Sequence, residues 1–288
     1  MTKDIVFITG VSSGIGYHTC KTLIKNDYSV VGSVRSEEDK ARLLKEMGSD
    51  FHCLVFDVTD YKAIDKAMEE LDQLLKGRSI RYLINNAGIA VPGPLEFIDD
   101  EDFQNQIQVN LIAVRYITNS ILKRMPKNEI QNKAKIIFIS SVSGIFAAPF
   151  NGAYCISKHA LECMIDIYRR ELMIYDIDCI SIQPGPIKTR IWSKTMGKFE
   201  PFKQTVYANI ANKADKILEH SEKHALPVER VTNRILKILN LKRPKTRYIV
   251  HTNSFGLKLL ANWLPDRFVD RLIWNNLNKA DSNTYRPV

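Results

Sequence analysis

The chain has 288 residues and a mass of 33.0 kDa, enough for one large domain or two small ones. Hydrophobic residues make up 45% and charged residues 25%, so the composition excludes collagen, coiled coils and disordered chains. The net charge of +9 is uneven, because residues 188–288 hold 20 of the 41 Lys and Arg but only 8 of the 32 Asp and Glu. This basic third could face an anionic cofactor, an acidic membrane or a nucleic acid, or it could simply keep the surface soluble.

Cysteine usage and hydropathy indicate the compartment. The five cysteines form no CxxC pair and are odd in number, which is typical of a reduced intracellular chain. No apolar run approaches the roughly 20 residues of a membrane-spanning helix. The first residues enter a strand-like run at once and leave no room for a signal peptide. We therefore expect a cytoplasmic protein.

Short apolar runs alternate with amphipathic helical patterns along the chain, and no linker or repeat divides it. The runs are apolar almost throughout, as in parallel strands that are buried on both faces. The sequence therefore predicts an α/β fold with a doubly wound, Rossmann-type parallel sheet in a single domain over residues 1–288. The predicted strands are 5–8, 28–31, 51–56, 81–84, 134–139, 179–182 and 247–250. The main predicted helices are 36–47, 60–75, 102–124 and 153–175.

A glycine-rich turn, TGVSSGIG over residues 9–16, joins the first strand to a helix. Glycine allows the sharp turn and lets backbone N–H groups approach a pyrophosphate, whose charge is favoured at a helix N-terminus. The spacing is GxxxGxG rather than the common GxGxxG. Taken alone, the turn could also be purely structural. The candidate phosphate-binding residues are Gly10, Ser12, Ser13, Gly14, Ile15 and Gly16.

The glycine turn and several further motifs together resemble the compact, single-domain branch of the short-chain dehydrogenase/reductase family. An NNAG element at 85–88 follows the fourth strand, a Ser–Tyr–Lys set spans 141–158, and a Pro-Gly turn follows the sixth strand. The resemblance covers about residues 4–190 in the family's order. It implies an NAD(P)-dependent oxidoreductase with seven strands in the order 3-2-1-4-5-6-7. The catalytic residues that it implies are Asn110, Ser141, Tyr154 and Lys158.

Tyr154 and Lys158 are four residues apart, so both project from one face of a helix. A free phenol has a pKa of about 10, and an adjacent ammonium lowers that pKa, so Tyr154 could exchange a proton with an alcohol or carbonyl. The Ser141 hydroxyl would hydrogen-bond the reacting oxygen. In the family, the lysine also binds the nicotinamide ribose, and the residue that matches Asn110 holds a water that relays protons. Each residue alone has an ordinary structural reading, whereas the combination is specific.

The end of the second strand indicates which cofactor is preferred. An acidic residue there would bind the ribose 2′-OH of NAD(H), but the chain has Val34 followed by Arg35. Arginine binds phosphate through a planar set of donors, so we expect NADP(H) in preference to NAD(H). A solvated Arg35 is the alternative. The further cofactor-binding residues that the resemblance implies are Asp57, Val58, Asn86, Ala87, Gly88, Tyr154, Lys158, Pro184, Gly185, Ile187 and Thr189.

Apolar and aromatic residues follow the sixth strand, where the family has a lid that closes over the substrate, here expected over about 189–230. With the apolar residues near Ser141 they favour a hydrophobic alcohol or ketone, although such residues can also simply pack within the lid. Segments 140–144, 148–150, 184–189 and 243–248 are similar to hydroxysteroid and retinol dehydrogenase-like members. These act on steroids, retinoids or other lipid-like alcohols. The candidate substrate-binding residues are Ser141, Val142, Phe150 and Trp192.

The C-terminal extension, about 252–288, is basic and amphipathic. It could lie on an anionic membrane, pack beside the substrate pocket or contact a second subunit. The family's usual assembly implies a homodimer or homotetramer, formed through the helices that carry Asn110 and Tyr154. The apolar stripe of the predicted tail helix consists of Phe268, Leu272, Ile273 and Leu277.

Two other classes of function find little support. His220 and His224 have the i, i+4 spacing of metal ligands, but no third ligand accompanies them, so we expect no metal site. Apart from charge, no motif favours nucleic-acid binding. The alternative to an enzyme is a regulator that binds NADP(H) without turnover. Loss of the tyrosine or the lysine would mark such a protein, and both are present.

Overall fold

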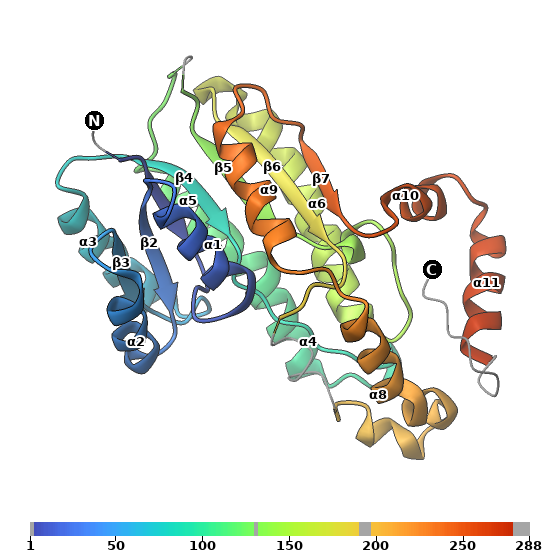
Figure 1. Cartoon of the computed structure of the whole chain (residues 1–288). Coiled ribbons are helices and arrows are strands. Elements are labelled where there is room, and N and C mark those ends of the chain that lie inside the picture. Colours follow the sequence, from blue (N-terminus) through green and yellow to red (C-terminus); the bar gives the residue numbers. More distant parts are fainter. Residues whose placement is uncertain (1–2, 130–131, 190–196, 279–288) are drawn as a thin grey trace.

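A parallel β-sheet of seven strands forms the centre of the protein (Figure 1). The computed structural model describes residues 3–129, 132–189 and 197–278. The strand order is β3-β2-β1-β4-β5-β6-β7, and every neighbouring pair is parallel. The predicted fold class and the strand order implied by the family resemblance are confirmed. The strands are β1 (Ile5–Ile8), β2 (Ser29–Val34), β3 (Phe51–Val55), β4 (Ile80–Asn85), β5 (Lys135–Ile139), β6 (Asp178–Pro184) and β7 (Arg247–Val250).

Consecutive strand residues are buried on opposite faces of the sheet, which explains why the runs are apolar throughout. In β1, Ile5 and Phe7 belong to the core cluster on one face, whereas Val6 and Ile8 belong to the cluster on the other. None of these four side chains is more than 5% exposed. Because both faces are covered, a ligand can reach this sheet only at the ends of the strands.

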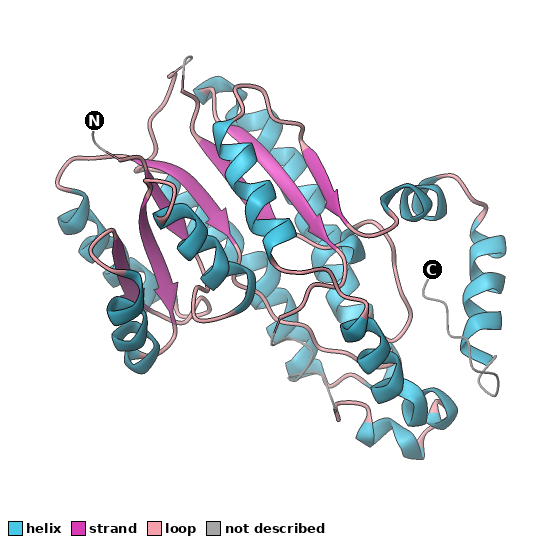
Figure 2. Ribbon diagram, in the orientation of Figure 1, coloured by secondary structure: helices cyan, strands magenta, loops and turns pink. Residues whose placement is uncertain are grey.

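Helices cover both faces of the sheet (Figure 2). They are α1 (Gly14–Ile24), α2 (Glu37–Met47), α3 (Tyr61–Leu75), α4 (Asp100–Ile107), α5 (Ala113–Leu122), α6 (Gly152–Glu171), α8 (Ala208–Lys223), α9 (Glu229–Asn240), α10 (Ser254–Asn262) and α11 (Asp266–Asn278). Apolar residues of α3, α5 and α6 pack into the cluster on one face. Those of α1, α2 and α9 pack into the cluster on the other face.

The starts of two helices follow capping signals in the sequence. Ser36 accepts a hydrogen bond from the backbone N–H of Asp39 (3.2 Å) at the start of α2. Asp60 accepts one from the N–H of Ala63 (3.0 Å) at the start of α3. Each bond satisfies an N–H group that has no partner within its helix. Both helices therefore begin within one residue of the predicted position.

Two predicted helices depart from regular α geometry. The helix expected over 102–124 is divided into α4 and α5 by a turn of π-helix, η2 (Gln108–Ile112). The helix expected over 153–175 continues after α6 as the 3-10 turn η4 (Leu172–Tyr175). Hydrophobic periodicity does not register such changes, because one altered turn leaves the apolar face in place. Further 3-10 turns are η1 (Leu95–Phe97), η3 (Val142–Gly144) and η5 (Glu200–Gln204).

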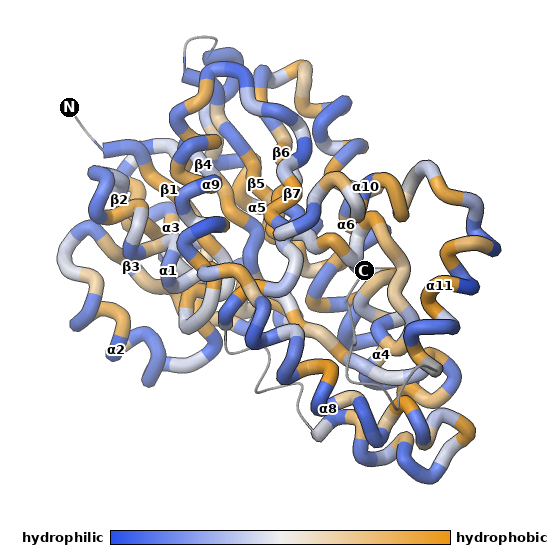
Figure 3. Tube along the Cα trace, turned by 45° about the vertical axis from the view of Figure 1, so that its right-hand side comes forward, coloured by the Kyte–Doolittle hydropathy of each residue, from blue (hydrophilic) through white to orange (hydrophobic). Residues whose placement is uncertain are grey.

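The C-terminal elements lie outside the layers that sandwich the sheet. Residues around η5 and α8 form a small apolar cluster of their own. Beyond β7, α10 and α11 lie to one side of the sheet (Figures 1 and 3). On α11 the buried residue is Val269, whereas Phe268, which belongs to the predicted stripe, is half exposed. Within the described ranges, no helix is long and apolar enough to cross a membrane.

Candidate active site

The glycine turn between β1 and α1 has a backbone that glycine adopts most readily. Gly10 and Gly14 have φ angles of 70° and 59°, in the left-handed region. A Cβ atom on Gly16 would lie 2.3 Å from the carbonyl oxygen of Gly10. The turn is therefore tightly folded at the carboxyl end of β1, where the sequence predicts a phosphate site.

The start of α1 presents backbone donors to this end of the sheet. Ser13 precedes the helix in an extended conformation, and its side chain makes no capping hydrogen bond. The first N–H groups of a helix lack partners within it and favour an anion. The nearest atoms to a Cβ placed on Gly14 belong to Thr189, at 3.6 Å. The uncapped helix start and the space beside Gly14 fit the pyrophosphate of a dinucleotide.

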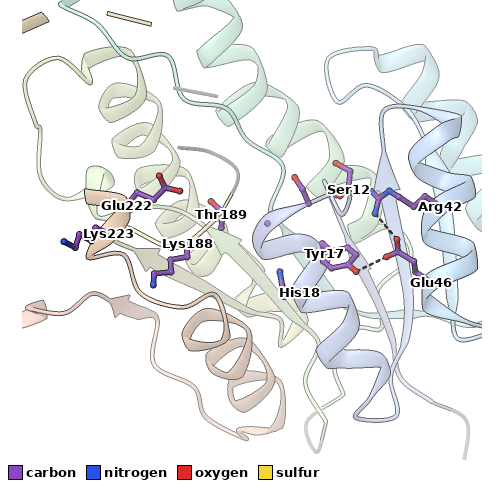
Figure 4. Close-up of a pocket in the computed structure, with 11 residues that line it drawn as sticks. Ser12, Tyr17, His18, Arg42, Glu46, Lys188, Thr189, Glu222 and Lys223 are labelled. Carbon is purple, nitrogen blue, oxygen red and sulfur yellow. Dashed lines mark hydrogen bonds and ion pairs between the residues drawn. The ribbon is translucent and has the colours of Figure 1, made fainter. Parts of the chain in front are cut away.

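A cleft of about 970 Å³ opens over the glycine turn (Figure 4). The cations of Arg42, Lys188 and Lys223 outnumber the carboxylates of Glu46 and Glu222 in its lining. An excess of positive charge favours an anionic ligand. The lining residues are Ser12, Ser13, Gly14, Tyr17, His18, Arg42, Glu46, Lys188, Thr189, Glu222 and Lys223.

Arg42 contacts the glycine turn, although it is not one of the predicted cofactor residues. Its Nη2 donates to the backbone carbonyl of Ser12 (2.9 Å), and its guanidinium pairs with Asp39 (2.7 Å) and Glu46 (3.4 Å). The sequence shows these acidic residues three and four positions away, a pattern that marks a helix face rich in ion pairs. Nothing in the pattern indicates that this face meets the glycine turn.

The predicted adenosine-side residues lie at the carboxyl ends of β2 and β3. Arg35 directly follows β2 and is exposed, whereas Val34 is buried. Across the described ranges, Arg35 makes no ion pair or side-chain hydrogen bond. Asp57 accepts hydrogen bonds from the N–H (2.8 Å) and hydroxyl (2.7 Å) of Thr59, and Val58 is buried. Arg35 is thus free to meet a ligand, while the Asp57 carboxylate is oriented by its own turn.

The NNAG segment anchors the glycine turn to β4. The side-chain amide of Asn86 donates to the carbonyls of Thr9 and Gly10, both at 2.8 Å. The N–H groups of Asn86 and Ala87 donate to Thr9 Oγ1, both at 2.9 Å. These bonds fix the turn relative to the neighbouring strand. The segment therefore holds in place the glycine turn over which the cleft opens.

Asn110 lies in the π-helical turn η2 and is fully buried. Its Oδ1 accepts from the N–H of Ile89 (2.9 Å), and its Nδ2 donates to the Ile89 carbonyl (3.0 Å) and to Ser157 Oγ (3.1 Å). A Cβ on Gly88 would lie 3.2 Å from Asn110 Oδ1. Turns of π-helix often occur at functional sites. Asn110 thus links the segment after β4 to α6.

Ser141, Tyr154 and Lys158 come together at the carboxyl end of β5. Ser141 follows this strand and caps η3, accepting from the N–H of Ser143 (3.1 Å). Lys158 Nζ donates to the carbonyl of Ile139 (2.9 Å) and lies 5.7 Å from the centre of the Tyr154 ring. Ser141 and Lys158 are both buried. The fold therefore places the predicted hydroxyl, phenol and ammonium in one group.

Burial and hydrogen bonding set the proton affinities of this group. Burial raises the pKa of Tyr154 above its ordinary value, and a hydrogen bond with Ser141 opposes this rise only in part. The lowering of this pKa that the sequence predicts from Lys158 is therefore not found, because the cost of burying the phenolate is larger. Burial also lowers the pKa of Lys158 to about 8, and the negative charge of Glu162 opposes this effect. The charge of Lys158 can therefore change close to neutral pH. Such groups in a cleft are candidates for proton transfer.

The Pro-Gly turn packs against the last strand of the sheet. Pro184 ends β6, and the N–H of Gly185 donates to the carbonyl of Val250 (3.0 Å). A Cβ on Gly185 would lie 2.2 Å from His251 Cδ2, so any other residue here would have to displace the His251 ring. Ile187, a predicted cofactor contact, is buried in a core cluster. The turn thus fixes the start of the segment that lines the cleft.

Aromatic contacts connect the loop before α6 to the segment before α8. Phe150 has a φ of 61°, and its ring meets Tyr207 edge to face with the centroids 5.4 Å apart. Tyr207 meets Phe97 in the same manner at 5.9 Å. Val142 begins η3, directly after Ser141, and Trp192 lies outside the described residues. An apolar wall thus extends from the catalytic end of β5 towards the C-terminal elements.

The histidine pair and the cysteines have ordinary surroundings. His224 Nδ1 lies 2.8 Å from the carbonyl oxygen of His220. In the parts of the chain that the structure describes, no group of three or more His, Cys, Asp or Glu residues could hold a metal ion. All five cysteines are free thiols.

The chain is similar to known oxidoreductases in both sequence and fold. A family model described as short chain dehydrogenase matches residues 4–198. An NADPH-dependent 3-dehydrocapnine reductase of Ornithobacterium rhinotracheale is 39% identical over 94% of this chain and 96% of its own length. Retinol dehydrogenase 16 of Mus musculus is 27% identical over 94% of this chain and 88% of its own length.

A solved structure extends the likeness to the whole fold. A short-chain dehydrogenase/reductase from Burkholderia phymatum, solved in complex with NAD, has a TM-score of 0.76 at 19% identity. The match covers 89% of this chain and 92% of the other. Together with the glycine turn and the Ser–Tyr–Lys group, these matches establish that the chain belongs to the short-chain dehydrogenase family of NAD(P)-dependent oxidoreductases.

Proposed function

We propose that the protein is an NADP(H)-preferring reductase that interconverts a hydrophobic carbonyl compound and its alcohol. The observation that carries this proposal is the grouping of Tyr154 with Lys158 and Ser141 at the carboxyl edge of the sheet, the edge over which the basic cleft opens. A protonated phenol beside an ammonium and a second hydroxyl is suited to donate a proton to a carbonyl oxygen.

Each side chain of this group has a distinct role in reduction. Tyr154 donates its phenolic proton to the carbonyl oxygen of the substrate, and it takes the proton back during oxidation. Ser141 donates a hydrogen bond to the same oxygen and fixes its position. The ammonium of Lys158 stabilises the phenolate that remains, and Asn110 holds a water that returns a proton to the lysine. The bound cofactor supplies or accepts the hydride.

The cofactor would lie across the carboxyl ends of β1, β2 and β4. The glycine turn and the start of α1 bind the pyrophosphate, and Lys158 binds the nicotinamide ribose. Arg35, exposed and without a partner among the described residues, binds the 2′-phosphate that distinguishes NADP(H). The NADPH dependence of the 39% identical reductase supports this preference. The other residues that would line the cofactor are Asp57, Val58, Asn86, Ala87, Gly88, Pro184, Gly185, Ile187 and Thr189.

The substrate would bind against the apolar wall beside Ser141. Val142 and Phe150 contact it, and a lid over about 189–230, which contains Trp192, closes the site. The edge-to-face contact of Phe150 with Tyr207 supports an apolar substrate, because it adds two aromatic rings next to the start of α6, the helix that carries Tyr154. The names of a 3-dehydrocapnine reductase and a retinol dehydrogenase among the relatives support a ketone or aldehyde of a hydrophobic alcohol.

A screen of carbonyl compounds tests the proposed reaction. The purified protein is mixed with NADPH or NADH and with 3-dehydrocapnine, retinal, a 3-ketosteroid or a long-chain aliphatic ketone. Loss of NADPH absorbance and formation of the matching alcohol are expected for at least one of these compounds. Tight NADPH binding without turnover on any of them would favour the regulator that binds NADP(H). No binding of either cofactor would contradict both readings.

We also propose a homodimer or homotetramer that assembles through the helices carrying Asn110 and Tyr154. Exposed isoleucines on these helices support it, because Ile112, Ile156 and Ile167 are 38%, 41% and 46% exposed. Light scattering should give two or four times the chain mass. A monomer at micromolar concentration would exclude this assembly.

We further propose a cytoplasmic enzyme whose C-terminal elements contact a membrane surface peripherally. Three large aromatic side chains support this contact, since Phe255, Trp263 and Trp274 are 80%, 80% and 63% exposed. Co-sedimentation with phosphatidylglycerol vesicles should be reduced by Trp263→Ser. Equal recovery of both proteins in the supernatant would contradict the contact.

A further inference from the structure

A stripe of ionisable residues continues along α6 beyond the catalytic pair. Tyr154, Lys158, Glu162 and Asp166 follow one another at intervals of four residues, so all four lie along one side of the helix. Glu162 is only 6% exposed. A buried carboxylate is costly unless it is paired and hydrogen-bonded, so its partners determine what it does.

Both oxygens of the Glu162 carboxylate are bound by neighbouring strands. Its Oε1 accepts from the hydroxyl of Ser181 on β6 (2.5 Å), and its Oε2 accepts from Nε of Arg247 on β7 (2.9 Å). The other end of the Arg247 guanidinium binds Asp166 (2.9 Å), which also pairs with Arg169 (3.2 Å). The carboxylate is therefore held at a fixed place against the sheet. Arg247 belongs to the 243–248 segment, for which the proposed reaction gives no role.

The turn after β5 packs against α6 between the lysine and this carboxylate. A Cβ placed on Gly144 would lie 2.9 Å from the carbonyl oxygen of Lys158 and 3.0 Å from Cγ of Glu162. On the strand side, the ammonium of Lys158 binds the uncharged carbonyl of Ile139. Glu162 lies one helical turn beyond Lys158 on α6, and Arg247 of β7 is bound to its carboxylate. The negative charge of Glu162 raises the pKa of Lys158 and so opposes the effect of burial.

We propose that Glu162 is a positioning residue of the catalytic group, and that its carboxylate, held by Ser181 and Arg247, favours the charged form of Lys158 beside Tyr154. The inference rests on the role proposed for Lys158. Arg247 acts through Glu162 in two ways. It orients the carboxylate, and its positive charge weakens the effect of that carboxylate on Lys158.

The titration of Lys158 tests this proposal directly. The protein is labelled with [ε-13C]lysine, and the Lys158 resonance is assigned by its absence in Lys158→Met. The pH midpoint of the Lys158 titration is then compared in the wild type and in Glu162→Gln. This variant keeps the shape of the Glu162 side chain but removes its charge. Without the anion, the midpoint should fall by about one pH unit, or about tenfold in the protonation equilibrium. An unchanged midpoint would overturn the proposal.

Two control variants separate charge from structure. Glu162→Asp keeps the negative charge but shortens the reach to Ser181, so its midpoint should stay closer to that of the wild type than to that of Glu162→Gln. Asp166→Asn breaks the same ion-pair group one helical turn further from Lys158 and should move the midpoint by less than about 0.3 unit. If Asp166→Asn lowers the midpoint as much as Glu162→Gln does, the loss of any nearby negative charge accounts for the shift and the proposal fails.

A double variant covers the case in which Glu162→Gln leaves Arg247 unpaired and does not fold. Glu162→Gln/Arg247→Gln removes both charges of the pair, so the midpoint of Lys158 should be lower in the double variant than in Arg247→Gln alone. Equal midpoints in these two variants would overturn the proposal. These measurements need no substrate and no cofactor, so failure of the positioning role and failure of the proposed reaction can be told apart.

Discussion

The described residues before position 190 and those from 197 to 278 place functional groups in different ways. In the first region, the cofactor side of the site is built from backbone geometry, such as the positive φ angles of Gly10 and Gly14 and the ends of adjacent strands. In the second, side chains such as Tyr207 and Arg247 contribute through contacts with distant parts of the chain. Local motifs therefore identify the cofactor side, whereas only the folded chain shows what the other side does.

The largest expected effect concerns the glycine turn. In Gly16→Ala the new methyl group would lie 2.3 Å from the carbonyl oxygen of Gly10, so the turn must open. We expect at least about a hundredfold loss of NADPH affinity in a fluorescence titration, or about 2.7 kcal/mol. Gly48→Ala controls for a general loss of stability, because it strains a backbone with a φ of 79° but adds no contact within 4 Å. Equal affinities in both variants would show that the turn does not build the cofactor site.

The buried lysine gives a pH-dependent effect on stability. The pKa of Lys158 is lowered from 10.5 to about 8, so between these values the unfolded chain binds more protons than the folded one. Stability from this group is present above the ordinary pKa and is lost as the pH falls through about 8. Relative to Lys158→Met, the wild type should gain about 2 kcal/mol of unfolding free energy between about pH 8 and pH 10.

Urea unfolding at several pH values measures this difference. Lys45→Met is the matched control, because Lys45 is exposed on α2. The difference in unfolding free energy between Lys45→Met and the wild type should not change over the same pH range. If the difference in unfolding free energy between Lys158→Met and the wild type is also independent of pH, burial does not lower the pKa of Lys158.

The cofactor preference gives a smaller effect. Arg35→Ala should reduce the preference for NADPH over NADH by about tenfold, or about 1.4 kcal/mol, since the 2′-phosphate loses its donor. Parallel titrations with both cofactors measure it, with Lys45→Ala as a variant that loses the same charge elsewhere. If NADPH affinity falls equally in both variants, general electrostatic attraction accounts for the preference.

The smallest expected effect falls on the second region. Tyr207→Ala removes the edge-to-face contacts with Phe97 and Phe150, so the KM for a hydrophobic ketone should rise about fivefold. NADPH affinity should not change, because Tyr207 is not among the residues of the cofactor cleft. Phe255→Ala, at an 80% exposed position on α10, is the control. A loss of NADPH affinity in Tyr207→Ala would show that the second region also builds the cofactor site, against the comparison made above.

Much of the fold could be predicted because the sheet is buried on both faces. Apolar runs predicted β1 and β7 to the residue, and the other strands to within three residues at either end. The π turn around Asn110 could not be predicted, since it changes the hydrogen bonding without changing the apolar pattern. The order of the strands came from the family resemblance rather than from periodicity.

Site residues that belong to a short sequence motif could be predicted, whereas those that act through contacts with distant residues could not. The glycine turn and the spacing of Tyr154 and Lys158 can be read along the chain. Arg42 and Glu162 were missed, because their roles depend on contacts with Ser12, 30 residues away, and with Arg247, 85 residues away. The sequence shows such residues only as charges on a helix face.

The most direct test of the account is reduction of an accepted ketone with NADPH by the wild type and by Tyr154→Phe. The variant keeps the ring and removes only the hydroxyl group that donates the proton. We expect kcat/KM to fall by about a thousandfold while NADPH affinity falls by less than about threefold, the loss of one hydroxyl contact to the cofactor. A variant that keeps more than about a tenth of the wild-type kcat/KM would contradict the assignment of Tyr154 as the proton donor.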